Sequence, residues 1–264
     1  TKHLPLTLYR AEQVRELDRI AIHEHGIAGF LLMSRAGAAT FEVIKQRWAP
    51  PSTLLVYCGL GNNGGDGYVI AALSQQAGFD VTIVQVGNIS EKEPELVLSS
   101  DALQAYRQAV AVGVTMVPFD VNNLPLFNGE LHESTNERLS ETSSFGKANK
   151  ADCIIVDALL GTGLNGDVRD EYSAAIHAIN AMYLPVVAVD IPSGLCANTG
   201  RVLGSAVNAA ITVTYIGLKQ GLITASGPQQ CGGLFFAGLN VPASVLQKVT
   251  PSAERVNHAS VRRV

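Results

Sequence analysis

The stretch CGLGNNGGDG, residues 58–67, combines a glycine pattern with side chains that can do chemistry. Gly59, Gly61 and Gly64 have the G-x-G-x-x-G spacing of a dinucleotide-binding turn, in which a helix N-terminus holds a pyrophosphate. Asp66 is expected one or two residues into that helix, where its carboxylate would compete with a phosphate. The loop is therefore expected to bind something other than a plain pyrophosphate.

The neighbouring amides of Asn62 and Asn63 strengthen this expectation, because a phosphate cradle needs mostly backbone groups. An ordinary Rossmann dehydrogenase also needs an acidic residue about 20 residues further on, at the end of the second strand. The stretch TIVQVGN, residues 82–88, ends without one. A purely structural alternative stays open, in which Asp66 caps its helix and the two asparagines form a tight turn.

Two further polar turns follow apolar stretches that read as buried strands. Asp157 follows CIIV and leads to GTGLNGD, residues 161–167, whose backbone N–H groups suit a ligand phosphate. Asp190 follows PVVAV and leads to IPSG, which presents the Ser193 hydroxyl. Since ligands bind beyond the carboxyl ends of parallel strands, the three turns should bring Asp66, Asp157 and Asp190 around one crevice.

Three carboxylates at a site for an anionic nucleotide need a counter-charge. No His or Cys is placed to bind a transition metal, and amide, hydroxyl and carboxylate oxygens are hard ligands. One carboxylate with Asn and Ser oxygens indicates a weakly charged cation, with Mg²⁺ held through water as an alternative. Asp157 as a structural cap of its own turn is the other reading.

Composition excludes several classes of protein. The 264 residues carry a formal charge of −4, which argues against binding to nucleic acid. Four scattered cysteines without a C-x-x-C motif predict a reduced, cytoplasmic protein, and no apolar run is long enough to span a membrane. The chain begins with Thr1, so a removed targeting peptide stays compatible with it.

Hydrophobic periodicity predicts two N-terminal helices, in 11–26 and 30–48, followed by alternating strands and helices. The alternation predicts a doubly wound, Rossmann-like α/β domain with a mostly parallel sheet. Residues 121–150 are rich in Asn, Ser and Glu and are expected to form a surface insertion. The domain is expected to cover residues 1–245, with 246–264 as a C-terminal tail or linker.

The motifs together resemble the NAD(P)H-hydrate epimerase family, also called the YjeF N-terminal domain. They are CGLGNNGGDGYV, VDALLGTGL, AVDIPSGL, NTG at 198–200 and TVTYIGLKQGL. The resemblance implies a three-layer α/β/α sandwich, usually a homodimer. It implies that the enzyme interconverts the R and S forms of NADH and NADPH hydrated at C6 of the nicotinamide ring, supplying an ATP- or ADP-dependent dehydratase. In many bacterial members the dehydratase is fused to this domain, so the chain is compatible with one half of a bifunctional enzyme.

The resemblance also implies roles for particular residues. Potassium would be held by Asn63, Asp157 and Ser193. The substrate would be bound by Asn62, Asn63, Gly64, Gly65, Asp66, Gly161, Thr162, Gly163, Leu164, Asn165, Gly166, Asp167 and Asp190.

Epimerisation at a carbon beside the ring nitrogen needs a carboxylate that passes a proton and stabilises a cationic intermediate. We expect Asp190 to serve as this catalytic residue, with Asp66 as the second candidate. Lys219 is expected either to meet a phosphate or to pair with a carboxylate. The alternatives are a non-catalytic nucleotide-binding or scaffold domain of the same fold and a conventional NAD-dependent dehydrogenase, which the missing ribose-binding acid disfavours.

Overall fold

The central element is a seven-stranded sheet in which all neighbouring strands are parallel, with the order β4-β3-β2-β5-β6-β7-β8. The computed structural model describes residues 4–87, 94–122 and 152–256. The chain order reverses between β2 and β5, where doubly wound folds open a ligand crevice. The strands are β2 (Thr53–Cys58), β3 (Asp80–Gln85), β4 (Thr115–Pro118), β5 (Cys153–Ala158), β6 (Val186–Val189), β7 (Ile211–Tyr215) and β8 (Gly233–Ala237).

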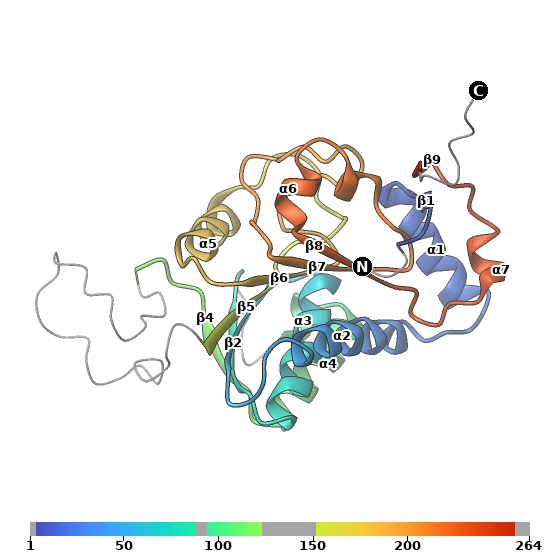
Figure 1. The fold of residues 1–264 in the computed structure, drawn as a ribbon. Helices are drawn as coiled ribbons and strands as arrows, with labels where there is room; N and C mark the ends of the chain where they lie inside the picture. Colours follow the sequence, from blue (N-terminus) through green and yellow to red (C-terminus); the bar gives the residue numbers. More distant parts are fainter. Residues whose placement is uncertain (1–3, 88–93, 123–151, 257–264) are drawn as a thin grey trace, which may run out of the picture.

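Helices cover both faces of this sheet (Figure 1). One face carries α2, α3 and α4, and the other carries α5 and α6. The helices are α1 (Ala11–His23), α2 (Gly29–Lys45), α3 (Asn62–Gln76), α4 (Ser100–Ala111), α5 (Asp170–Ala181), α6 (Gly227–Cys231) and α7 (Ala243–Leu246). The structure thus confirms the three-layer α/β/α architecture.

The strand β2 shows why a parallel sheet needs both helical layers. All six of its residues are buried. Leu54 and Val56 belong to the core cluster beneath α2, α3 and α4, whereas Leu55 and Tyr57 belong to the cluster beneath α5. Because successive side chains point to opposite faces, an uninterrupted apolar strand fits only between two apolar layers.

The two ends of the described chain meet beside the sheet. Strand β1 (Thr7–Leu8) pairs antiparallel with β9 (Ala253–Glu254). Neither short strand was predicted, since two residues carry no periodic pattern. The residues after 245 that the structure describes therefore contact the N-terminus, while the predicted domain boundary itself stays a prediction.

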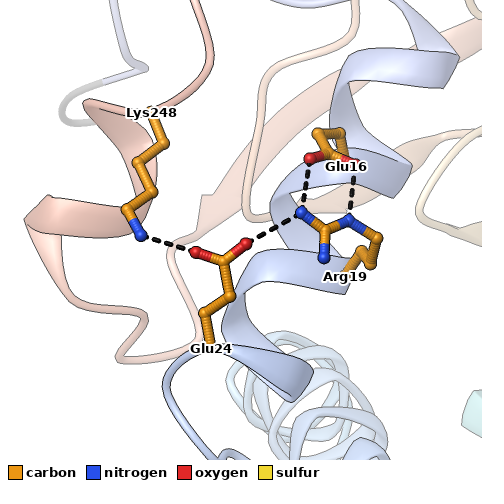
Figure 2. Close-up of polar contacts among 4 residues, drawn as sticks. All are labelled: Glu16, Arg19, Glu24 and Lys248. Carbon is orange, nitrogen blue, oxygen red and sulfur yellow. Dashed lines mark hydrogen bonds and ion pairs between the residues drawn. The ribbon is translucent and has the colours of Figure 1, made fainter.

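A network of exposed ion pairs joins the C-terminal end of α1 to the segment that follows α7 (Figure 2). Arg19 contacts both Glu16 and Glu24 at 2.8 Å, and Lys248 contacts Glu24 at 2.5 Å. Exposed pairs contribute little to stability, so the apolar face of α1 supplies most of its attachment.

The predicted insertion at 121–150 lies outside the described residues except for 121 and 122.

Candidate functional site

A cavity of about 660 Å³ lies at the carboxyl ends of the strands and extends to α1 and α2. Its polar wall contains nine of the predicted substrate-binding residues: Asn62, Asn63, Asp66, Gly161, Thr162, Gly163, Leu164, Asn165 and Asp190. The lining also includes apolar residues, among them Val14, Leu32 and Met33. The volume and mixed lining suit a nucleotide-sized ligand.

Several other predicted residues lie beside the cavity and not in its wall. Gly166 and Asp167 are absent from the lining, and Asp157 is fully buried beneath it.

The backbone packing of the first loop explains why it contains glycines. A side chain at Gly64 would place its Cβ 2.0 Å from the carbonyl oxygen of Gly59. Gly64 therefore permits the close approach of the helix to its own loop, and the sequence pattern alone does not separate this role from ligand contact.

The helix N-terminus is free of acidic side chains, which corrects one expectation. Helix α3 begins at Asn62 with Gly61 as its N-cap, so Asp66 is the fifth helical residue and not the first or second. Its carboxylate therefore does not compete for the free N–H groups of the first turn. Asp66 instead faces the cavity, and an anion can still approach the start of α3.

By contrast, the helix that follows the second loop is poorly suited to a phosphate. Helix α5 begins three residues after Asp167 and carries Asp170 and Glu171 in its first turn. These carboxylates already occupy the positive end of the helix dipole. Any phosphate bound by the loop at 161–167 would therefore depend on the loop backbone and on cations from elsewhere.

The Asp66 carboxyl favours its neutral form. Burial raises its pKa well above the ordinary value, and the carboxylates of Asp190 and Asp18 raise it further, against a smaller opposing effect of Lys219. A protonated carboxyl in a ligand cavity can act as a proton donor.

Asp190 stands in an unusual backbone conformation at the end of β6. Its φ is +66°, and the N–H of Ile191 donates to the carbonyl of Val189 across it, which makes a γ-turn. Ile216, at the end of the adjacent β7, repeats this geometry with φ +58° and a hydrogen bond from Gly217 to Tyr215. Such turns are strained, and Asp tolerates positive φ better than most residues. Asp190 lines the cavity from this turn.

Lys219 compensates the charge of Asp190. The ammonium group is fully buried and donates to Asp190 Oδ1, to Thr214 Oγ1 at 3.1 Å and to the Tyr215 carbonyl at 2.9 Å. Asp190 Oδ1 also accepts from the Tyr215 N–H at 3.1 Å. The second of the two predicted alternatives for Lys219 is thus observed, since all three of its protons meet acceptors within the protein.

Sequence reasoning missed Asp18, which lies on α1 and lines the same cavity. Burial raises the pKa of Asp18 to about 6, with Lys219 lowering it and Asp190 raising it. Arg15, one turn earlier, also lines the cavity and donates from Nη1 to the Thr162 carbonyl at 3.1 Å. On the sequence both residues belong to an ordinary amphipathic helix, so no local pattern distinguishes them.

Two of the predicted cation ligands, Asp157 and Ser193, contact each other beneath the cavity, and the third, Asn63, lies in the cavity wall. Ser193 donates from its N–H to Asp157 Oδ2 at 2.8 Å and from its hydroxyl to Asp157 Oδ1 at 2.6 Å. Burial raises the pKa of Asp157 to about 6 although these hydrogen bonds lower it. The amide nitrogen of Asn63 is buried and has no partner among the described residues, and this side chain contacts the Gly161 position.

These donors fit a monovalent cation better than a transition metal. Among residues 4–87, 94–122 and 152–256, no three His, Cys, Asp or Glu side chains gather as a metal site. The oxygens of Asn63, Ser193 and Asp157 would offer a cation two neutral hard ligands and one carboxylate. In the same described ranges no helix is both long and apolar enough to cross a bilayer.

Solved structures show the same fold. The crystal structure of yeast ynu0 superposes with a TM-score of 0.71 and covers 96% of both chains at 18% sequence identity. This similarity concerns the architecture alone.

Curated relatives are similar over most of this chain. A protein named "Bifunctional NAD(P)H-hydrate repair enzyme Nnr" from Coxiella burnetii is 38% identical over 242 residues, and one from Escherichia coli is 35% identical over 259 residues. These matches cover 92% and 97% of this chain but only 43% and 44% of the relatives, so the chain spans less than half of their length. The "NAD(P)H-hydrate epimerase" of Limosilactobacillus fermentum is 32% identical and is matched over 94% of its own length.

The sequence profile described as "YjeF-related protein N-terminus" matches residues 30–221, which contain all three polar turns and Lys219. With the fold, the relatives and the profile in agreement, the chain belongs to the YjeF-related N-terminal family.

Proposed function

We propose that this chain is an isomerase that interconverts the R and S forms of hydrated NADH and NADPH. The relatives named as epimerases and repair enzymes support this activity. The observation that carries the proposal is the pairing of Asp190 with a fully buried Lys219 beside Asp66 in one nucleotide-sized cavity. A purely structural role of the Asp190–Lys219 pair would not explain why a second carboxyl group with a raised pKa, that of Asp66, lines the same cavity.

The reaction proceeds at the ring carbon that carries the hydroxyl and adjoins the nitrogen. A carboxyl gives its proton to the hydroxyl, the C6–O bond breaks, and water leaves as the nitrogen lone pair forms an iminium bond. Water then adds to the other face of C6 and returns a proton to the carboxylate, so no atoms or electrons are gained or lost. Ring opening is the alternative route, and it needs the same proton transfers.

The two carboxyl groups divide this work. Asp66, whose pKa is raised by burial and by Asp190 and Asp18, supplies the proton. Asp190, which pairs with Lys219 and accepts from the Tyr215 N–H, stabilises the iminium, accepts the proton of the incoming water and passes it back to Asp66, so that both carboxyl groups return to their starting state.

We further propose that potassium binds between Asn63, Asp157 and Ser193. The Asn63 side chain, whose buried amide nitrogen has no partner among the described residues, and the single buried carboxylate of Asp157 support this assignment. The ion would supply one positive charge beneath the loop at 161–167, where the ligand phosphates are expected. The remaining substrate contacts proposed from the family, including Gly64, Gly65, Gly166 and Asp167, would act by shaping the two loops.

At the level of assembly, we propose a homodimer that works with an ATP- or ADP-dependent hydrate dehydratase. The bifunctional relatives, which extend well beyond this chain, support a fusion of the two activities. A cytoplasmic location is proposed from the scattered cysteines. Sedimentation equilibrium of the purified chain distinguishes a dimer from a monomer.

The first test is the rate of conversion of pure R-hydrate of NADH to the S form, followed by chromatography against the spontaneous rate. The wild type should accelerate it, and Asp190→Asn should lower kcat by roughly 10²- to 10⁴-fold, the usual contribution of a proton-transferring group. Asn is chosen because it tolerates the positive φ of position 190. Asp80→Asn, at the opposite end of the sheet, serves as the control. Absence of acceleration by the folded wild type would favour a non-catalytic nucleotide-binding domain.

The potassium assignment is tested by replacing K⁺ with Na⁺ in the same assay and in thermal unfolding. We expect K⁺ to raise the melting temperature of the wild type, because an ion bound only to the folded state stabilises it. Asn63→Leu should abolish the difference between the two ions. An equal response of wild type and variant would place the effect of K⁺ elsewhere.

A further inference from the structure

The cavity wall is rich in acidic side chains and poor in available positive charge for a site that is proposed to hold a dinucleotide. Four acidic residues line it, Asp18, Asp66, Asp101 and Asp190, against two basic ones, Arg15 and Lys219, among the described residues. Lys219 is fully buried, and each of its three protons already meets an acceptor in the protein. Charge for an anionic ligand must therefore come from elsewhere.

Among the described side chains that line the cavity, Arg15 is the cation that remains available. It is exposed, it lies on the cavity-facing side of α1, and its Nη1 donates to the Thr162 carbonyl at 3.1 Å. No carboxylate among the described residues forms an ion pair with it, and one hydrogen bond uses only a part of the five N–H donors of a guanidinium. The remaining donors form a planar fork that matches phosphate oxygens.

The position of Arg15 adds to this argument. By holding Thr162, it places its charge beside the loop at 161–167, which α5 cannot assist because its first turn is acidic. The free N–H groups of the first turn of α3, which also lines the cavity, offer a second phosphate contact.

We infer that Arg15 binds the diphosphate of the substrate, bridging α1 to the loop at 161–167. This inference rests on the proposed function for the identity of the substrate, but its charge argument applies to any diphosphate-linked dinucleotide. Arg15 is thus a binding residue, distant in role from the proton transfers of Asp66 and Asp190.

The chain offers a matched control. Arg19 follows Arg15 by one helical turn and is also exposed, but it is engaged by Glu16 and Glu24 and is absent from the cavity wall (Figure 2). Replacing Arg19 removes the same charge from the same helix without touching the proposed site.

The test compares wild type, Arg15→Gln, Arg15→Lys and Arg19→Gln. ADP-ribose, which has the diphosphate but no nicotinamide, and adenosine, which has no phosphate, are titrated by calorimetry at low and high salt. We expect R15Q to weaken ADP-ribose binding by about 10-fold or more, as for a lost charge-assisted hydrogen bond. R15K should be intermediate, the salt dependence should shrink in R15Q, and adenosine binding should not change. With the hydrate as substrate, R15Q should raise KM by the same factor with kcat nearly unchanged, and R19Q should match the wild type.

The outcomes separate this inference from the proposed function. If the wild type epimerises the hydrate and R15Q keeps the wild-type Kd and KM, the role of Arg15 is refuted and the function stands. If R15Q weakens adenosine and ADP-ribose equally without altering the salt dependence, Arg15 only supports the loop, and the inference is again refuted. If the wild type does not epimerise but binds ADP-ribose in an Arg15-dependent manner, the proposed reaction fails and the diphosphate site is upheld.

Discussion

At the scale of single residues, the site consists of three carboxyl groups that share one buried ammonium group. Lys219 donates a hydrogen bond to Asp190, whereas it acts on Asp66 and Asp18 only by longer-range electrostatic attraction. Burial raises the pKa values of Asp66 and Asp18, and the negative charge of Asp190 raises them further, whereas Lys219 opposes this only in part. The same cavity therefore contains one carboxyl group that pairs with a cation, Asp190, and two that hold a proton more tightly than usual, Asp66 and Asp18.

A pH dependence of stability follows for Asp18. Its pKa is about 6 in the folded protein against an ordinary value of 3.8, so the folded state holds the proton more tightly than the unfolded state. The groups that face it are Asp66, Asp190 and Lys219. Its contribution to the free energy of unfolding is complete below pH 4 and is lost as the pH rises to about 6. The Asp18→Asn variant lacks this loss of stability. Relative to the wild type, its free energy of unfolding should therefore rise between pH 4 and 6, by at most about 3 kcal/mol.

Urea unfolding at several pH values measures this difference. Glu12, on the same helix, provides a control of opposite sign, because a backbone hydrogen bond and the Asn198 amide lower its pKa. Its contribution to the free energy of unfolding is present at higher pH and is lost as the pH falls. The Glu12→Gln variant should therefore become less stable relative to the wild type as the pH rises. Parallel curves for D18N and wild type would contradict the proposed environment of Asp18.

At the scale of elements, the first loop and its helix are built around contacts too close for a side chain. A Cβ at Gly59 would lie 2.1 Å from the carbonyl oxygen of Leu159, and one at Gly64 would lie 2.0 Å from the carbonyl of Gly59. The two glycines therefore stack α3 on the loop after β2 and this loop on the loop after β5. The cavity wall depends on this stacking, since Asn63 and Gly161 meet across it.

We predict that Gly64→Ala lowers the free energy of unfolding by about 1–3 kcal/mol or prevents folding, because backbone must move to admit the methyl group. Gly163→Ala is the control, since a Cβ there meets nothing within 4 Å, and it should change the stability by no more than about 0.5 kcal/mol. Chemical denaturation followed by circular dichroism compares the two variants. A G64A protein as stable as G163A would mean that the loop has more room than the structure shows.

At the scale of the whole molecule, the two ends of the described chain close the structure beside the site. The N–H of Ser252 donates to the Leu8 carbonyl at 2.9 Å, and the next residue, Tyr9, exchanges backbone hydrogen bonds with Leu218 and Gln220 on either side of Lys219. The C-terminal segment thus supports the N-terminal strand, which in turn supports the turn that carries Lys219.

Two truncations test this arrangement. A chain ending at Thr250 loses β9, and we expect a lower melting temperature. A chain ending at Leu246 also loses Val249, a buried core residue, and should be less stable again by about 1–2 kcal/mol. Thermal unfolding of both chains against the full one gives the comparison. Unchanged stability in both would support the prediction that residues 246–264 are a tail or linker.

The sequence by itself determined the layers of the fold and the composition of one side of the cavity. Uninterrupted apolar strands such as β2 require helices on both faces, and parallel strands bring their following turns to one edge. These local patterns suffice to place Asp66 and Asp190 near each other. They also suffice to place the loop at 161–165, which comes shortly after β5, in the cavity wall.

Only the tertiary structure decided the electrostatics. The partner of Lys219, the approach of Asp18 and Arg15 from α1, and the strained turn at Asp190 depend on contacts between segments that are distant in the sequence. Hydrophobic periodicity reports which face of a helix is buried, but not which polar residue at the border of that face meets the end of a strand. Strand ends are local properties of the chain, whereas charge pairing depends on how the helices pack against them.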